Sequence, residues 1–103
     1  FNEPCDHFPV ITHEVQLTEM TREANKRFFS SIDEVPTAAV TMGIGTVMAA
    51  RKIVMVITGA DKADILYKVF FGPVTPEVPG SILQFHHDVT LICDEAAAAR
   101  MPQ

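Results

Sequence analysis

The sequence is poor in basic residues. Eight lysines and arginines stand against thirteen aspartates and glutamates, which gives a formal net charge of −5. Such a balance argues against a general nucleic-acid or acidic-membrane surface, because no basic excess exists to neutralise phosphates. It leaves room for a small anionic ligand, which responds to local charge. No apolar run approaches the roughly 20 residues of a membrane-spanning helix.

Cysteine is scarce as well. Cys5 and Cys93 form no spacing motif, so we expect reduced thiols and a cytoplasmic protein rather than a disulfide framework. The adjacent pair His86-His87 does not indicate a metal site either, because neighbouring side chains cannot share a face and no other ligands stand at metal spacing. A polar turn is favoured there. A length of 103 residues suits one small domain.

The strongest pattern lies over residues 52–72. Residues 53–58 are β-branched or apolar throughout, which predicts a strand covered on both faces, as in a parallel sheet. Gly59 breaks this run, and Asp61 offers an oxygen to cap the helix that follows. Gly72 ends that helix. Its apolar positions recur at helical spacing: Ala63, Leu66, Val69 and Phe70.

Lys62 does not fit a plain core helix. It lies in the predicted first turn, near the middle of the apolar stripe. A cation at a helix start opposes the macrodipole. An anion held between the free amide groups and this ammonium would account for it, so Lys62 is a candidate anion ligand.

A second helix is predicted over 18–29, with Thr18 as its N-cap. The spacing places Met20, Ala24 and Phe28 on the inner face, and Arg22 and Lys26 toward solvent. Arg27 falls on the inner face by the same spacing. It either lies at the edge of the stripe with its guanidinium in water, or points into a cleft where it can bind phosphate or carboxylate. Spacing alone favours the first.

Shorter elements are predicted over 14–17, 38–42, 46–50 and 89–93. The turn Gly43-Ile44-Gly45 is not a dinucleotide fingerprint, because Met48 stands where a third glycine is needed. Strands that alternate with helices predict an α/β fold with a parallel sheet and right-handed crossovers. Ligands bind such sheets beyond the carboxyl ends of the strands, where Lys62 sits and which Arg27 could reach.

The start of the chain has the character of an internal segment. It reads Phe1-Asn2-Glu3-Pro4 without an initiator methionine, and the strand count is low for a doubly wound sheet. These features predict a piece of a larger domain. From its residue type alone, Glu3 is a solvated loop carboxylate.

A series of short motifs runs along the chain: Phe1-Asn2-Glu3-Pro4, Thr21-Arg22 through Asn25, Arg27-Phe28-Phe29, Val35-Pro36, 41–46, Gly59 with Lys62-Ala63, 72–75, Leu83-Gln84 with His86, and Asp94-Glu95. Together they resemble the glucosamine-6-phosphate deaminases, and the first motif distinguishes these from the related phosphogluconolactonases. The resemblance implies that residues 1–103 are the C-terminal part of a single domain with a mobile lid over about 17–39. The implied fold is a Rossmann-like parallel-sheet sandwich of the ribose-5-phosphate isomerase-like type.

The resemblance also implies a reaction, which joins hydrolase and isomerase chemistry. Glucosamine 6-phosphate and water become fructose 6-phosphate and ammonia, by ring opening, proton transfer between C2 and C1, and deamination, without a metal or an organic cofactor. Glu3 matches the glutamate of the ring-opening group, where it supports a histidine and an aspartate. Arg27 and Lys62 match the ligands of the substrate phosphate.

Other parts of the family's site are expected before Phe1: the ring-opening histidine and its aspartate partner, the aspartate base and a Ser/Thr-rich phosphate loop. We therefore expect the isolated chain to have little or no activity, and to form a homo-oligomer or associate with the missing N-terminal part through its exposed sheet. Allosteric members of the family carry basic residues near His13 and Val15, and this sequence differs from them over residues 5–15, which argues against activation by N-acetylglucosamine 6-phosphate. The alternative is a non-catalytic sugar-phosphate-binding module; Glu3 favours the enzyme.

Overall fold

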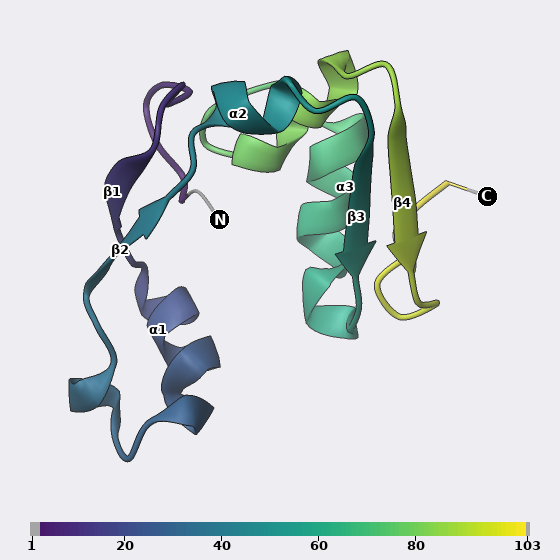
Figure 1. Ribbon diagram of the computed structural model, residues 1–103. Helices are drawn as coiled ribbons and strands as arrows, with labels where there is room; N and C mark the ends of the chain where they lie inside the picture. The colour runs from purple at the N-terminus through teal and green to yellow at the C-terminus, as the bar shows by residue number, and fades with distance from the viewer. Residues whose placement is uncertain (1–2, 103) are drawn as a thin grey trace.

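The computed structural model describes residues 3–102 (Figure 1), so Phe1 and Asn2 of the first motif and Gln103 lie outside the described residues. Strands and α-helices follow one another as β1 (His13–Gln16), α1 (Glu19–Asn25), β2 (Ala38–Thr41), α2 (Ile44–Met48), β3 (Ile53–Ile57), α3 (Ala63–Phe71) and β4 (Val89–Cys93). Four 3-10 helices lie over Lys26–Phe28, Ile32–Glu34, Ala60–Lys62 and Pro79–Phe85. No helix among residues 3–102 is long and apolar enough to cross a membrane.

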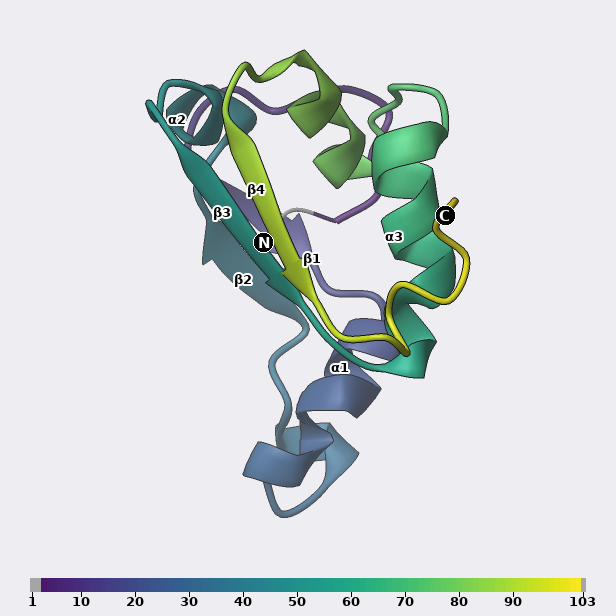
Figure 2. The same cartoon turned by 90° about the vertical axis from the view of Figure 1, so that its right-hand side faces the viewer.

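β3 and β4 form a parallel sheet, with Ile53 opposite Val89 and Ile57 opposite Cys93. The predicted parallel sheet is confirmed. α3 lies along one face of it (Figure 2), and burial alternates along both strands. On the other face Val54 is 54% exposed and Val56 67%. The prediction of a strand covered on both faces is wrong for the described residues, because a helix covers one face alone.

The core lies between α3 and the segments that follow it in the sequence. Leu66 has no exposed surface, and the other buried apolar side chains of this layer are Ala63, Val69, Leu83 and Ala97. Gln84 fastens the end of α3, since its Nε2 donates to the carbonyl oxygens of Val69 at 2.8 Å and Gly72 at 2.9 Å. These bonds satisfy carbonyl groups that a helix end leaves without partners. We call residues 53–97, which run from β3 through α3, Pro79–Phe85 and β4 to the turns after β4, the α3 layer.

β2 does not join this parallel sheet. It pairs antiparallel with β1, with His13 opposite Thr41 and Gln16 opposite Ala38. The prediction that residues 38–42 share one parallel sheet with the later strands is therefore wrong for the described residues. The connection offers a reason: a parallel crossover takes about a dozen residues or more, whereas residues 42–52 separate β2 from β3 and α2 is five residues long.

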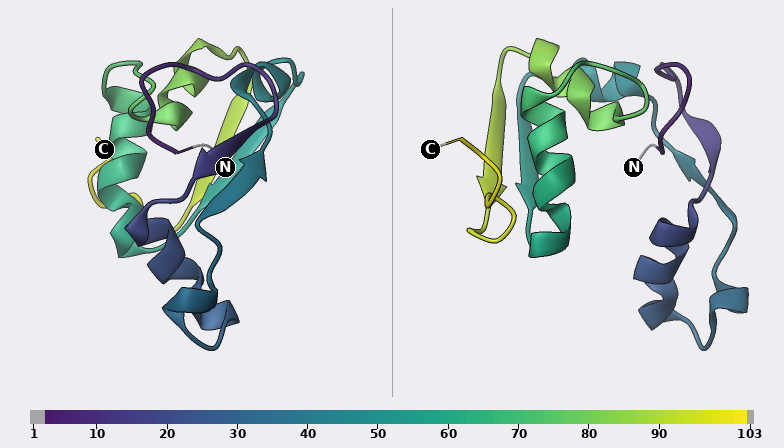
Figure 3. Two further views of the ribbon diagram at one scale, coloured as in Figure 1. Left: turned by 90° about the vertical axis from the view of Figure 1, so that its left-hand side faces the viewer. Right: turned by 180° about the vertical axis from the view of Figure 1, so that it is seen from behind.

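Residues 17–37 leave β1 and return to β2 as a projecting unit (Figure 1), which we call the helical lobe. Its two ends are joined, because the Leu17 N–H donates to the Thr37 carbonyl at 2.8 Å. Seen from behind, the helical lobe and the α3 layer stand on different sides of the molecule (Figure 3). The Cα radius of gyration is 14.5 Å, above the roughly 13 Å of a compact domain of this length.

α1 begins where predicted, but the side of the helix that packs on the protein is not the predicted one. The Thr18 side chain accepts from the Thr21 N–H at 3.2 Å, which confirms the N-cap. Met20 is 81% exposed and Phe28 67%, so the predicted inner face is wrong. Arg22, predicted to face solvent, has a side chain only 18% exposed. The lobe packs the polar side of this short helix against its own return segment, leaving the apolar side uncovered within the chain.

Candidate functional site

A hollow of about 640 Å³ lies along residues 3–16. Its lining combines apolar side chains with titratable ones, among them Glu3, Cys5, His7, His13 and Glu14. Carboxylates, a thiol and imidazoles are the groups that carry protons in enzymes. The candidate site is therefore built from the segment that carries the Glu3 motif, and the other predicted site residues are placed relative to it.

Glu3 is held by the helical lobe. Its Oε1 accepts a hydrogen bond from the Thr21 hydroxyl at 2.8 Å, across 18 residues of sequence. Two residues later, the Cys5 N–H donates to the Pro76 carbonyl at 3.0 Å, in the loop that follows α3. The half-buried Glu3 carboxylate thus sits on a segment bound to both the helical lobe and the α3 layer. The prediction of a solvated loop side chain is wrong in this respect.

The rim of the hollow is bonded to the first residues of α2. The Ile44 N–H donates to Pro9 O at 2.7 Å, and the Gly45 N–H donates to Val10 O at 3.0 Å. A Cβ on Gly43 would lie 2.2 Å from the Val10 carbonyl carbon. Gly43 is therefore a close backbone contact. The interpretation of residues 43–45 as a tight turn is wrong, because Gly43 is extended, α2 begins at Ile44 and Gly45 lies inside this helix.

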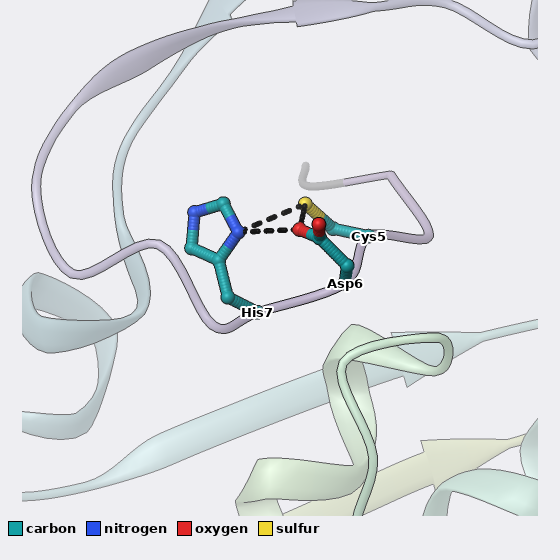
Figure 4. A network of polar contacts seen from close by, with 3 residues as sticks. All are labelled: Cys5, Asp6 and His7. Atoms are coloured by element: carbon teal, nitrogen blue, oxygen red, sulfur yellow. Dashed lines mark hydrogen bonds and ion pairs between the residues drawn. The ribbon is translucent and has the colours of Figure 1, made fainter.

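Cys5, Asp6 and His7 form a polar network on this segment (Figure 4). His7 Nδ1 lies 2.7 Å from Asp6 Oδ1 and 3.6 Å from Cys5 Sγ, and Cys5 Sγ lies 3.7 Å from Asp6 Oδ1. The hydrogen bond from His7, followed by the one from Cys5, lowers the pKa of the Asp6 carboxyl below its usual value.

The thiol, carboxylate and imidazole of this network are also ligand types that bind metal ions. Within residues 3–102 it is the one set of three or more histidine, cysteine and carboxylate ligand atoms that lie within 4.8 Å of one another. Asp6 and His7 are exposed, and each ligand atom has a partner inside the trio. The expectation that no metal is needed stays a prediction. Spacing did not reveal the network, because its members are consecutive; the string Cys-Asp-His itself was the available signal.

Arg27 lies in the 3-10 helix Lys26–Phe28 and is exposed. Its Nη1 donates to the Ala24 carbonyl at 2.8 Å, and its guanidinium carbon lies 4.5 Å from the centre of the Phe28 ring. Of the two placements that spacing left open, the structure shows the one with the guanidinium in water. The ring contact holds the guanidinium plane while leaving further N–H donors free for an anion.

Lys62 ends the 3-10 helix Ala60–Lys62 and precedes α3, just past the carboxyl end of β3. Its side chain is exposed and has no hydrogen-bond or ion-pair partner within the described part of the chain. The predicted cap at Asp61 is wrong, since no side chain caps α3. Instead both Asp94 carboxylate oxygens lie 3.2 Å from the Gly59 N–H, at a residue with a φ of 98°, which glycine adopts without strain.

Glu3 lies in a loop, and Arg27 and Lys62 lie in two different 3-10 helices. No hydrogen bond or ion pair joins any two of them among residues 3–102. Arg27 belongs to the helical lobe and Lys62 to the α3 layer, and Glu3 lies on the segment bound to both. Their convergence on one ligand is not observed and stays a prediction.

His86 and His87 form a polar bend, as predicted. The His86 Nε2 lies 2.6 Å from the Ala50 carbonyl oxygen, and the Asp88 N–H donates to His86 Nδ1 at 3.0 Å. The carbonyl requires a proton on Nε2 and the amide requires a free Nδ1, so this is the neutral Nε2–H form. With both ring nitrogens bonded within the chain, His86 has no free metal ligand.

No family model matches the chain, but individual proteins do. It is 52% identical over 101 residues to the glucosamine-6-phosphate deaminase of Clostridioides difficile (strain 630), covering 98% of this chain and 41% of that protein. For the enzyme of the same name from Streptococcus thermophilus the identity is 55% over 101 residues, covering 98% and 43%. The chain is homologous to the glucosamine-6-phosphate deaminases. It spans about two fifths of the length of these relatives.

The solved structures agree with this homology to the deaminases. A monomeric glucosamine-6-phosphate deaminase, described as a missing link of the NagB superfamily, superposes with a TM-score of 0.90 and 44% identity, covering 97% of this chain and 42% of that one. The predicted resemblance and the mixed fold with a parallel sheet are confirmed. The ribose-5-phosphate isomerase-like classification and the position of residues 1–103 within the longer deaminases stay predictions.

Proposed function

We propose that this chain is part of a glucosamine-6-phosphate deaminase. The observation that carries the proposal is an identity above 50% to deaminases over nearly the whole chain. The proposed enzyme converts glucosamine 6-phosphate and water to fructose 6-phosphate and ammonia, in the cytoplasm. Ring opening comes first, followed by proton transfer between C2 and C1 and release of the amine.

Glu3 is proposed to act in ring opening. A carboxylate beside an imidazole orients the ring and stabilises its protonated form, so that the imidazole can move a proton to or from the sugar. The bond from Thr21 occupies one carboxylate oxygen. The second oxygen has no donor among the described residues, and is proposed to face the histidine.

Arg27 and Lys62 are proposed to bind the substrate phosphate. Both side chains are exposed, and both retain donors that suit a phosphate oxygen. Each charge-assisted hydrogen bond contributes roughly 1.5–3 kcal/mol. Because one lies in the helical lobe and the other in the α3 layer, a phosphate would bridge the two units.

The domain assignment follows from the same proposal. Residues 1–103 form the C-terminal part of one deaminase domain, and the segment over about 17–39 is its lid. The helical lobe supports this assignment, because residues 17–37 project from a two-stranded base and are joined at their ends by the Leu17–Thr37 bond. Closure of such a lid would carry Arg27 toward Lys62 and exclude water.

The uncovered face of the β3–β4 sheet is proposed to receive the rest of the deaminase polypeptide. Val54, Val56 and Ile92 project from this face and are more than half exposed. A contiguous apolar surface of this kind on a sheet marks a contact site. The deaminase relatives have about three fifths of their length beyond the part that this chain matches, which is ample to cover it.

A chimera tests the enzyme directly. In the Streptococcus thermophilus deaminase, the 101 matching residues are replaced by those of this chain, and ammonia release from glucosamine 6-phosphate is measured. We expect turnover by this chimera and none by the isolated 103-residue chain. A folded chimera without turnover would refute the proposed function, and sugar-phosphate binding without turnover would favour the binding module. Folding is checked by the thermal transition of the purified chimera.

Site variants of the chimera separate the two roles. Lys62→Ala is expected to raise KM by about tenfold or more, since it removes a bond to the phosphate. Lys68→Ala is the matched control, being an exposed lysine of α3 without a described side-chain partner. Glu3→Gln is expected to lower kcat much more than it changes KM. An unchanged KM in Lys62→Ala would remove Lys62 from the phosphate site.

A further inference from the structure

We infer that Thr21 is a positioning residue for the Glu3 carboxylate, through which the helical lobe sets the geometry of ring opening; this rests on the proposed function. The primary observation is the hydrogen bond of 2.8 Å from the Thr21 hydroxyl to Glu3 Oε1. Within residues 3–102 no other group donates to this carboxylate. Thr21 therefore controls its orientation.

The direction of this bond follows from the neighbouring hydroxyl. Thr18 Oγ1 accepts from the Thr21 N–H at 3.2 Å and donates its single proton to Thr21 Oγ1 at 3.1 Å. The Thr21 hydroxyl is thus an acceptor toward Thr18, and its own proton is directed to Glu3. An ionised carboxylate only accepts, so every donor in this series of hydrogen bonds meets an acceptor. We call the series from Thr18 through Thr21 to Glu3 the relay.

The relay is anchored in the same element that carries Arg27. Thr21 lies in the first turn of α1, and α1 continues directly into the 3-10 helix that contains Arg27. The Thr21 carbonyl also accepts from the Asn25 side chain at 2.9 Å, which stiffens this stretch. A phosphate bound at Arg27 and the carboxylate bound at Thr21 therefore share one helical support.

The opposite end of the Glu3 segment belongs to the other unit, through the bond from the Cys5 N–H to the Pro76 carbonyl. The Glu3 side chain is therefore bonded to the helical lobe, and the backbone two residues later, at Cys5, is bonded to the α3 layer. Any change in the position of the lobe is transmitted to the carboxylate oxygen at Thr21. Thr21 couples phosphate binding to ring opening by this route.

Two substitutions of Thr21 distinguish positioning from general folding. Thr21→Val keeps the shape and removes the donor, whereas Thr21→Ser keeps the donor and removes a methyl group. In the active chimera we expect Thr21→Val to lower kcat by about tenfold or more with little change in KM, and Thr21→Ser to restore most of the loss. Thr12→Val is the control, since Thr12 is exposed and has no described side-chain hydrogen bond.

A double-mutant cycle provides a readout that a purely structural role would not move. In a Glu3→Gln background the charged acceptor is gone, so we expect Thr21→Val to have less than a twofold further effect on kcat. An inactive chimera would refute the proposed function itself. If the chimera is active and Thr21→Val lowers kcat no more than Thr12→Val does, the inference is overturned. It is also overturned if the kcat losses of Thr21→Val and Glu3→Gln multiply in the double variant. Either result leaves the proposed function standing.

Discussion

The Arg22 side chain is bound to the main chain of Val35, with its Nη2 3.2 Å from that carbonyl oxygen. The same nitrogen lies 3.0 Å from the carbonyl oxygen of Ile32. Val35 is 3% exposed, and a carbonyl group near such a position needs a donor within the protein. The charged side chain of α1 thereby holds the return segment of the helical lobe.

Replacement of Arg22 by methionine should loosen the helical lobe. Arg22→Met keeps an unbranched stem and removes the donors, and hydrogen bonds to charged groups contribute roughly 1.5–3 kcal/mol. We expect a loss near the lower end, because the Arg22 Nε is buried without a partner among the described residues. Amide hydrogen exchange over residues 19–35 measures it. Arg51→Met, at an exposed arginine with no described side-chain bond, should leave these rates unchanged; equal rates in both variants would contradict the assignment.

Gly43 should not tolerate a side chain. The added Cβ of Gly43→Ala would lie 2.2 Å from the Val10 carbonyl carbon and oxygen, and backbone on both sides must move. Overpacking of this kind costs roughly 1–3 kcal/mol, measured as the free energy of urea unfolding. Gly80→Ala is the matched control, because its nearest neighbour is the Val69 side chain at 3.1 Å. A smaller loss for Gly43→Ala than for Gly80→Ala would show that the loop around Val10 is not closely packed on Gly43.

The Asp6–His7 contact predicts a pH response of the Glu3 segment. His7 lowers the pKa of the Asp6 carboxyl in the folded chain, so the contact stabilises the network above the ordinary carboxyl pKa. This stabilisation is lost as the pH falls through the lowered value. His7→Ala should raise the pKa of Asp6, observed by carbon NMR titration of the carboxyl group. The control His87→Ala should leave the Asp6 titration in place, and an unshifted titration in His7→Ala would exclude the contact in solution.

The uncovered sheet face predicts self-association of the isolated chain. Val54 and Val56 lie side by side on β3 and are more than half exposed, which favours contact with another apolar surface. The double substitution Val54→Thr with Val56→Thr keeps β-branched residues and should reduce the concentration-dependent mass seen in sedimentation. Val40→Thr, at an exposed valine of β2, should not. Equal association of all three proteins would place the contact elsewhere.

Local signals predicted much of the α3 layer. The apolar run over 53–58 became β3, and the spacing of Ala63, Leu66 and Val69 became the buried side of α3. Thr18 caps α1 as expected. These features depend on residues that are close in sequence, where rotamer preference, capping and apolar period act directly on the backbone.

The errors share a different cause. Spacing predicts Met20, Ala24 and Phe28 on one side of a continuous helix, whereas α1 ends at Asn25 and Phe28 lies in a 3-10 helix. Spacing also does not say which side of α1 another element covers. The same holds for 38–42, whose strand character was predicted while its partner, β1, was not. The apolar period of one segment shows which of its side chains share a surface. Which other element packs on that surface is decided by chain connections and by the packing of distant segments.

By itself the sequence determined the local elements, the acidic balance and the resemblance to the deaminases. Only the tertiary structure decided that Thr21 donates to Glu3, that Cys5 is bound to Pro76 and that Gly43 lies against Val10. Each of these contacts joins residues that are at least 18 positions apart in the sequence. Such pairs form only after loop closure brings separate segments together, and no local pattern encodes which hydroxyl or carbonyl each segment will meet.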